Sequence, residues 1–194
     1  DKILIGSFQR DSVGDDLDKP KWQKNPDLLI EICKLLPKEK YLLVLTGPRR
    51  HYLIKRCITE HIPYLFVGNK EVFEKKEDDI MINNQSDETI NLLYNLIDLN
   101  LVTSKSEGGP KAVLEASLTK TLICSTDVGF AKEFLHPDLM YSPDTIHIVK
   151  KVFEQIGEGI EKLESYKEYN YSRVQGVLGE DAYTSRIEKA ITSL

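Results

Sequence analysis

Residues 103–115 read TSKSEGGPKAVLE and predict the end of a strand, a glycine turn and the start of a helix. Pro110 suits the first helical position, where a missing N–H group costs nothing. Such a turn gathers free backbone N–H groups and the positive end of a helix dipole at one point. Because Gly108 and Gly109 have no side chains, a ligand can approach the backbone closely there. The stretch therefore predicts an α/β unit whose helix N-terminus suits a phosphate group.

Short apolar runs alternate with helical patterns on both sides of this stretch. The alternation predicts a three-layer, Rossmann-like α/β domain with a mostly parallel six-stranded sheet. The expected strands are residues 2–8, 40–46, 63–67, 79–83, 99–103 and 121–125. The expected helices between them are residues 26–37, 49–61, 86–97 and 110–119. A helical C-terminal section is expected from about residue 143, with helices at 144–166 and 179–193 separated by the polar aromatic stretch 166–171.

Composition limits the class of protein. The 194 residues are 41% hydrophobic and 29% charged, which is typical of a soluble globular chain. The net charge of −5 argues against a nucleic-acid partner, since such proteins carry a basic surface. No apolar run approaches the roughly 20 residues of a membrane-spanning helix. Cys33, Cys57 and Cys124 lie in apolar contexts, so we expect reduced core thiols and a cytoplasmic protein. Because the chain opens at Asp1 and leads directly into a strand, we expect a fragment of a longer protein without a targeting segment.

One long irregular stretch, residues 9–25, follows the first expected strand. It therefore leaves the carboxyl edge of the sheet, where open parallel sheets bind ligands. A charged loop of this length in a compact domain is usually functional or disordered, which makes it a candidate binding loop. For the flanking aromatic residues Phe8 and Trp22 we favour a hydrophobic anchor over a stacking surface for a base or sugar.

Two glutamates flank the glycine turn. Glu115 lies five residues after Pro110, about 7.5 Å along the helix axis. If a diphosphate bound over the first turn, the attached ribose would lie near this carboxylate, which accepts hydrogen bonds from vicinal hydroxyls. Glu107 precedes the turn, where the other end of such a ligand would lie. The alternative is that Glu107 only complements the helix dipole and that Glu115 is a solvated helix residue.

The paired glutamates around Gly108-Gly109-Pro110 resemble the motif of glycosyltransferase family 4, whose members are retaining enzymes of the GT-B fold. Further segments resemble the family in the same order across residues 3–135: Ile5–Arg10, Gln23–Leu29, Leu43–Gly47, Leu93–Leu99 and Ser125–Gly129. The resemblance implies that residues 1–194 form one nucleotide-sugar-binding domain, one half of a GT-B fold. The acceptor-binding N-terminal domain would be absent from this chain.

The resemblance also implies roles for individual residues. Arg10 and Lys24 would neutralise the diphosphate, although Lys19 and Lys21 compete with Lys24 because residues 9–25 hold an insertion. Glu115 would bind the ribose, and Glu107 would be the catalytic residue at the donor sugar or leaving group. The turn that would receive the distal phosphate comprises Gly108, Gly109, Pro110, Lys111 and Ala112.

The activity implied is transfer of a hexose from a UDP- or GDP-type donor, without a metal or another cofactor. Membrane contact is expected only through the missing domain, and the isolated domain is expected to turn over little or nothing. Two alternatives remain open: a non-catalytic partner-binding module of the same fold, and a related sugar-nucleotide epimerase or hydrolase.

Other charged residues are ambiguous or uninformative. Arg49 and Arg50 are either a further phosphate or base contact or surface cations at a helix start. The triplet Asp16-Leu17-Asp18 lies inside a charged loop and not at a strand end, which disfavours a metal role. The four histidines show no zinc-binding spacing.

Overall fold

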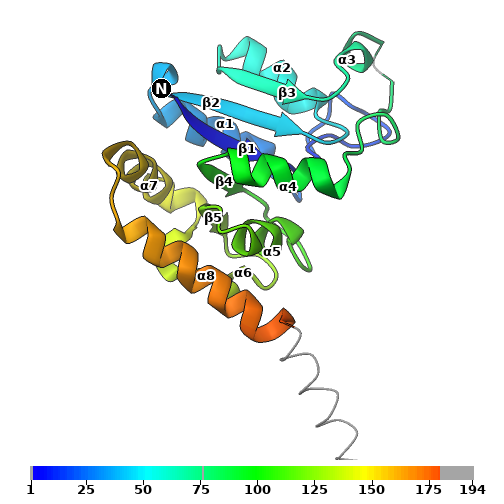
Figure 1. Ribbon diagram of the computed structural model, residues 1–194. Coiled ribbons are helices and arrows are strands. Elements are labelled where there is room, and N and C mark those ends of the chain that lie inside the picture. The colour runs from blue at the N-terminus through cyan, green and yellow to red at the C-terminus, as the bar shows by residue number, and fades with distance from the viewer. Residues whose placement is uncertain (1, 76, 180–194) are drawn as a thin grey trace, which may run out of the picture.

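The computed structural model describes residues 2–75 and 77–179, which form a three-layer α/β domain (Figure 1). Its six strands are β1 (Ile3–Ser7), β2 (Tyr41–Thr46), β3 (Tyr64–Val67), β4 (Leu99–Val102), β5 (Ile123–Thr126) and β6 (Met140–Tyr141). All adjacent strands pair in parallel, in the order β3-β2-β1-β4-β5-β6. The chain order reverses between β1 and β4, and ligands bind at such a switch point in open parallel sheets. The Rossmann-like parallel sheet predicted from the sequence is confirmed.

The helices are α1 (Pro26–Leu35), α2 (His51–Thr59), α3 (Glu71–Lys75), α4 (Asp87–Leu96), α5 (Lys111–Leu118), α6 (Ala131–Phe134), α7 (His147–Glu158) and α8 (Lys162–Leu178). Short 3-10 turns lie at Lys38–Lys40, Pro137–Leu139 and Pro143–Thr145. In the described part of the chain, no helix combines the length and the apolar character needed to traverse a bilayer.

Two apolar cores fill the space between the layers, one on each face of the sheet. Successive strand residues point to opposite faces, so Leu43 and Leu45 join the core under α1, α2 and α7, while Val44 joins the core under α4, α5 and α6. Cys33, Cys57 and Cys124 are buried and free, as expected. Burial raises the pKa of each thiol, that of Cys57 to about 12, so these thiols are inert packing groups at neutral pH.

The strand predicted at residues 79–83 is wrong. This segment forms turns, and the sixth strand is instead β6, which pairs with β5. The apolar residues that suggested a strand point outward, since Met81 is 87% exposed. The polar ends of the segment are buried: Asp79 accepts hydrogen bonds from the Arg49 backbone amide (2.7 Å) and from the Asn83 side chain (2.6 Å). A polar network, and not apolar burial, therefore fixes this segment.

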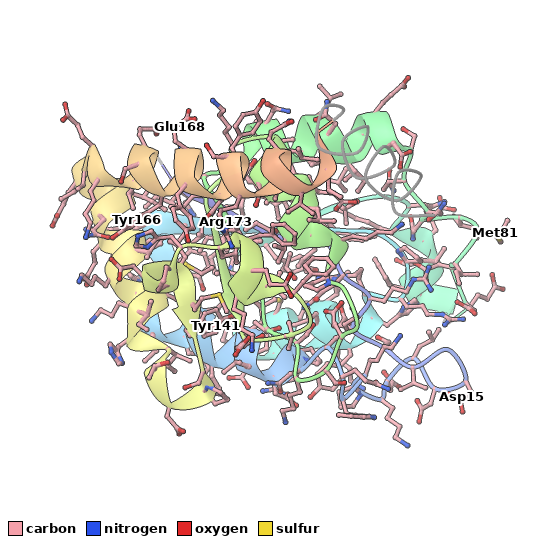
Figure 2. All side chains as sticks on the ribbon, turned by 90° about the horizontal axis from the view of Figure 1, so that it is seen from below. Asp15, Met81, Tyr141, Tyr166, Glu168 and Arg173 are labelled. Atoms are coloured by element: carbon pink, nitrogen blue, oxygen red, sulfur yellow. The ribbon has the colours of Figure 1, made fainter. Side chains whose placement is uncertain are left out.

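The C-terminal helical section also differs from the prediction of one helix over 144–166. Gly159 adopts φ +66°, a left-handed conformation that ends α7. The stretch 166–171, predicted to separate two helices, lies inside α8. There the Tyr166 hydroxyl donates to Asp138 (2.5 Å), and Asn170 accepts from the His136 backbone amide (2.8 Å). Figure 2 shows Tyr166 on the side of α8 that faces the sheet and Glu168 on the opposite side. Apart from Gly179, the helix predicted at 179–193 lies outside the described residues.

Candidate functional site

A pocket of about 410 Å³ opens at the carboxyl edge of the sheet, where β1 and β4 end side by side. Its walls come from the segment after β1, the loop of residues 9–25, the turn before α5, and α4 and α5. The structure brings together every site residue predicted from the sequence except Gly108, which does not line the pocket: Arg10, Lys24, Glu107, Gly109, Pro110, Lys111, Ala112 and Glu115. Residues nearly a hundred positions apart in the chain thus meet at one place.

The cationic wall of the pocket contains Arg10, Lys21 and Lys24. The loop that carries the lysines folds back on itself through an antiparallel bridge between Ser12 and Pro20. Burial, together with the charges of Lys24 and Arg10, lowers the pKa of Lys21. Lys19, the other lysine that competed with Lys24 in the sequence, does not line the pocket. Three cations at one wall repel each other, and a dianion relieves that repulsion.

Glu107 lies beside this cationic wall and has two side-chain partners. Its Oε2 forms an ion pair with Lys24 Nζ at 2.8 Å, and the two side chains are 12% and 20% exposed. The Ser104 hydroxyl donates to its Oε1 and also lies 3.1 Å from Gln9 Oε1. Both carboxylate oxygens therefore have a partner. Glu107 is thus an oriented anion beside the cations.

The N-terminus of α5 faces the pocket with unused amides. The helix begins at Lys111, one residue later than predicted, and Pro110 is its N-cap without a side-chain cap. Within the described residues, no acceptor pairs with the amides of Lys111 and Ala112, while Val113 N donates to Pro110 O (2.9 Å). The helix has eight residues, and free amides at the positive end of a helix are groups that favour an anion in general.

The turn before α5 is braced by the loop after β5. Gly129 has φ +53°, and a Cβ atom there would lie 2.7 Å from Gly108 O. A Cβ atom at Gly109 would lie 2.4 Å from the Phe130 ring, whereas one at Gly108 would meet open space. Packing against Phe130 therefore favours a glycine at position 109, independently of any ligand. In the sequence, Gly129 was identified only as the end of the segment Ser125–Gly129.

Glu115 is not a merely solvated helix residue. Its Oε2 accepts a hydrogen bond from the Tyr94 hydroxyl at 3.0 Å. Tyr94 is only 1% exposed, and its ring packs edge-on against Phe8 at a centroid distance of 5.1 Å. Burial and the Glu115 carboxylate raise the pKa of Tyr94 well above its usual value, so the phenol stays protonated and donates. In the sequence, Tyr94 was identified only as part of the segment 93–99, without a role of its own.

Neither arginine of the Arg49-Arg50 pair lines the pocket, and only Arg49 is a partly exposed cation before α2. Arg50 is completely buried, with its Nε 3.0 Å from Asp11 Oδ2. Burial raises the pKa of Asp11 to about 6 although Arg50 opposes this shift. Arg49 donates to both carboxylate oxygens of Asp78, at 2.9 and 2.6 Å. Both arginines hold loops in place at the edge of the sheet.

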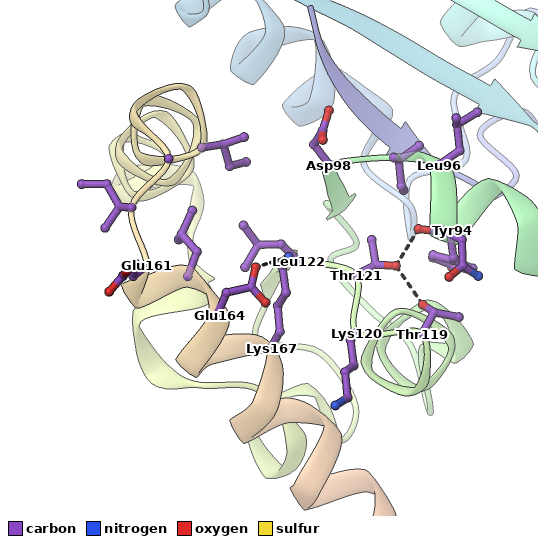
Figure 3. Close-up of a pocket in the computed structure, with 16 residues that line it drawn as sticks. Tyr94, Leu96, Asp98, Thr119, Lys120, Thr121, Leu122, Glu161, Glu164 and Lys167 are labelled. Atoms are coloured by element: carbon purple, nitrogen blue, oxygen red, sulfur yellow. Dashed lines mark hydrogen bonds and ion pairs between the residues drawn. The ribbon is translucent and has the colours of Figure 1, made fainter.

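Other candidates lie outside the pocket. Trp22 is 63% exposed, so its expected role as a hydrophobic anchor is wrong. The described residues contain no group of three or more His, Cys, Asp or Glu side chains arranged to hold a metal ion. Another pocket, of about 490 Å³, lies at the opposite edge of the sheet between the ends of α4, α5 and α7 and the start of α8 (Figure 3). It contains none of the predicted site residues.

The fold and the carboxyl-edge pocket define a class of protein: a Rossmann-like domain with a pocket lined by cations at its topological switch point. More specifically, the chain belongs to the family Glycosyl transferases group 1, which matches residues 20–175. No curated protein matches the sequence significantly.

Solved structures with the same fold include a protein in complex with UDP-glucose, a glucosyltransferase domain and a synthase. Anabaena Alr3699/HepE in complex with UDP-glucose has a TM-score of 0.71 and 16% identity, covering 100% of this chain and 50% of that one. The catalytic domain of cholesterol-alpha-glucosyltransferase from Helicobacter pylori has a TM-score of 0.66 and 15% identity, covering 90% and 99%. Sucrose-phosphate synthase from Thermosynechococcus elongatus has a TM-score of 0.68 and 15% identity, covering 100% and 45%. The chain thus spans half the length of the Anabaena protein and has the fold of one half of a GT-B glycosyltransferase.

Proposed function

We propose that the chain is the donor-binding, C-terminal domain of a retaining glycosyltransferase of family 4, and that its carboxyl-edge pocket binds a nucleotide-diphosphate sugar. One observation carries the proposal: a single pocket combines a cationic wall, a free helix N-terminus and two oriented carboxylates. A nucleotide-diphosphate sugar offers the matching groups, namely a dianion, a ribose and a polar sugar. The complex of the Anabaena protein with UDP-glucose supports this ligand class.

The proposed binding mode assigns each wall to one part of the donor. The diphosphate lies between Arg10 and Lys24 on one side and the amides of Lys111 and Ala112 on the other. Glu115 accepts hydrogen bonds from the ribose hydroxyls, and Gly109 and Pro110 lie under the distal phosphate. Positive groups fixed in advance stabilise the charge that develops on the leaving nucleoside diphosphate as the glycosidic bond breaks.

Binding of the donor changes the partner of Lys24. The Lys24–Glu107 ion pair at 2.8 Å occupies the cation that the diphosphate needs. When Lys24 turns to the phosphate, Glu107 loses one of its two partners and keeps Ser104. Its freed oxygen then accepts from a hydroxyl of the donor sugar or stabilises the reacting centre. Glu107 is therefore the proposed catalytic residue, and its carboxylate becomes available only with a donor in place.

The remaining parts of the proposal concern the full-length protein. A separate N-terminal domain binds the acceptor, a hexose is transferred with retention, and no metal ion takes part. The donor is of the UDP or GDP type. The isolated domain binds nucleotide but turns over little, the protein is cytoplasmic, and any membrane contact occurs through the other domain.

Calorimetric titration of the chain with UDP, GDP, ADP and UDP-glucose tests the proposal. We expect one of these nucleotides to bind at or below millimolar concentration. Glu107→Ala is expected to lower the affinity for the nucleotide sugar, and Glu115→Ala is expected to lower the affinity for the nucleotide itself. Glu154→Ala, an exposed control on α7, should change neither affinity. Absence of binding by all four ligands contradicts the proposal. Unchanged affinities in both pocket variants would favour a partner-binding module, and product analysis of the full-length protein separates transfer from hydrolysis or epimerisation.

A further inference from the structure

The Glu115 side chain makes one hydrogen bond within the described structure, the bond from the Tyr94 hydroxyl. The contact joins two helices, since Tyr94 lies on α4 and Glu115 on α5. It involves only Oε2 of the carboxylate, at 3.0 Å. The other oxygen, Oε1, has no partner among the described residues and belongs to a side chain that lines the pocket.

Tyr94 is held more firmly than the carboxylate it contacts. Its side chain is 1% exposed, and its ring meets Phe8 edge-on at an interplanar angle of 73°. Its backbone oxygen accepts from the Thr121 hydroxyl at 2.7 Å, a contact visible in Figure 3. Contacts with Phe8, which follows β1, and with Thr121, which follows α5, therefore fix the position of Tyr94, and its hydroxyl reaches Glu115 at the pocket.

A carboxylate that accepts hydrogen bonds from two vicinal hydroxyls binds them better when its orientation is already fixed. A glutamate on a helix has several rotatable bonds, and ordering them costs conformational entropy. A buried donor that occupies one oxygen fixes the plane of the carboxylate before a ligand arrives. The phenol can only donate here, because burial and the adjacent carboxylate raise the pKa of Tyr94. The open oxygen and the remaining lone pair of Oε2 then point at a ligand with two adjacent hydroxyl donors.

We infer that Tyr94 is a positioning residue that sets the preference of the pocket for a nucleotide with both ribose hydroxyls, acting through Glu115. The inference rests on the proposed function and deepens it, because it names the part of the ligand that this contact selects. A nucleotide without the two hydroxyls gains nothing from the oriented carboxylate. Removal of the phenol hydroxyl therefore weakens binding of the ribonucleotide and leaves binding of the dideoxynucleotide almost unchanged.

The test compares two ligands and three proteins by calorimetry. The ligands are uridine diphosphate and its 2′,3′-dideoxy analogue, with the guanosine pair used if the unaltered chain prefers guanine. We expect the unaltered chain to bind the ribonucleotide about tenfold or more tightly than the dideoxynucleotide, because hydrogen bonds to a charged group contribute about that much to affinity. In Tyr94→Phe the preference falls to about threefold or less. Tyr41→Phe is the matched control, since its buried hydroxyl donates to Cys33 O (2.9 Å) far from the pocket.

Several results would overturn the inference. An unchanged preference in Tyr94→Phe contradicts it, and so does an equal loss for both ligands, which would indicate general damage to the pocket. If circular dichroism shows that Tyr94→Phe is unfolded, Glu115→Asp replaces it: the shorter side chain withdraws from Tyr94, and a preference that survives this change also contradicts the inference. Failure of the unaltered chain to bind any nucleoside diphosphate is a separate outcome, which overturns the proposed function together with the inference.

Discussion

Replacing Arg50 with methionine removes the guanidinium that balances Asp11 inside the domain. The two side chains are 0% and 1% exposed, and Arg50 Nε lies 3.0 Å from Asp11 Oδ2. Asp11 would keep the hydrogen bonds from Leu53 N (3.1 Å) and the Ser12 hydroxyl (3.0 Å) but would lose its only counter-charge within the described residues. This pair joins the residue after Arg10 to the start of α2, so it also supports the cationic wall of the pocket.

The expected cost of Arg50→Met follows from the burial of the pair. Removing one partner of a buried ion pair destabilises a protein by about 3–5 kcal/mol, because the remaining charge stays desolvated. The double variant Asp11→Leu/Arg50→Met contains neither charge and similar side-chain volume. We expect its free energy of unfolding to return to within about 1 kcal/mol of the unaltered chain, or above it.

The pH dependence of the same pair has a definite sign. Burial raises the pKa of Asp11 to about 6 from 3.8, so the folded protein binds this proton more tightly than the unfolded chain. The resulting stability is fully present below pH 3.8 and is lost as the pH rises through 6. The shift of about 2 units corresponds to about 3 kcal/mol. The unaltered chain should therefore lose stability relative to the double variant as the pH rises from 4 to 7.

Urea unfolding followed by circular dichroism at pH 4, 5.5, 7 and 8 measures these effects. Arg50→Met should lose most stability at pH 8 and less at pH 4, where Asp11 is protonated. The reasoning is refuted if Arg50→Met stays within about 1 kcal/mol of the unaltered chain at pH 8, or if the double variant is no more stable than the single one.

Three further predictions concern the pocket. Lys24→Gln should weaken nucleoside diphosphate binding about tenfold in calorimetry because it removes a charge-assisted contact, while Lys19→Gln, outside the pocket, changes little; equal losses would count against the assignment. Gly129→Ala should destabilise the domain by about 1–3 kcal/mol in urea unfolding, because φ is +53° and the new Cβ lies 2.7 Å from Gly108 O, whereas Gly176→Ala inside α8 meets open space and should not destabilise it. Chelation by EDTA should leave nucleotide affinity unchanged in the same titration, and a loss restored by Mg²⁺ or Mn²⁺ would contradict metal-independent binding.

Local patterns predicted the fold because most of the sheet is buried on both faces. Strands such as β2 and β5 therefore contain short apolar runs, which can be recognised in the sequence. β6 spans only Met140–Tyr141, too short for any pattern. The apolar residues 80–82 resembled a buried strand, but Met81 and Ile82 are exposed while the polar neighbours Asp79 and Asn83 are buried. Burial of a polar network depends on partners elsewhere in the chain, such as the backbone of Arg49, which local sequence does not reveal.

The sequence predicted those site residues whose side-chain chemistry suits the ligand and whose place in the chain is at a strand end. Glu107 and Glu115 flank a glycine turn at a strand end, so topology alone places them at the carboxyl edge. Tyr94 was not predictable in its role, because an aromatic residue on an apolar helix face indicates packing, and its hydrogen bond to Glu115 arises only from the way α4 and α5 meet. The sequence likewise left Arg50 as either a phosphate or base contact or a surface cation, because its burial beside Asp11 depends on the fold.

The most direct measurement is the change in backbone amide chemical shifts when the ¹⁵N-labelled chain is titrated with UDP, GDP or ADP. If a nucleoside diphosphate binds at the N-terminus of α5, the largest saturable changes occur at the amides of Lys111 and Ala112, with smaller changes at residues 10 and 24. Changes centred on residues 119–122 at the opposite edge of the sheet, or no saturable changes with any of the three nucleotides, would contradict the account.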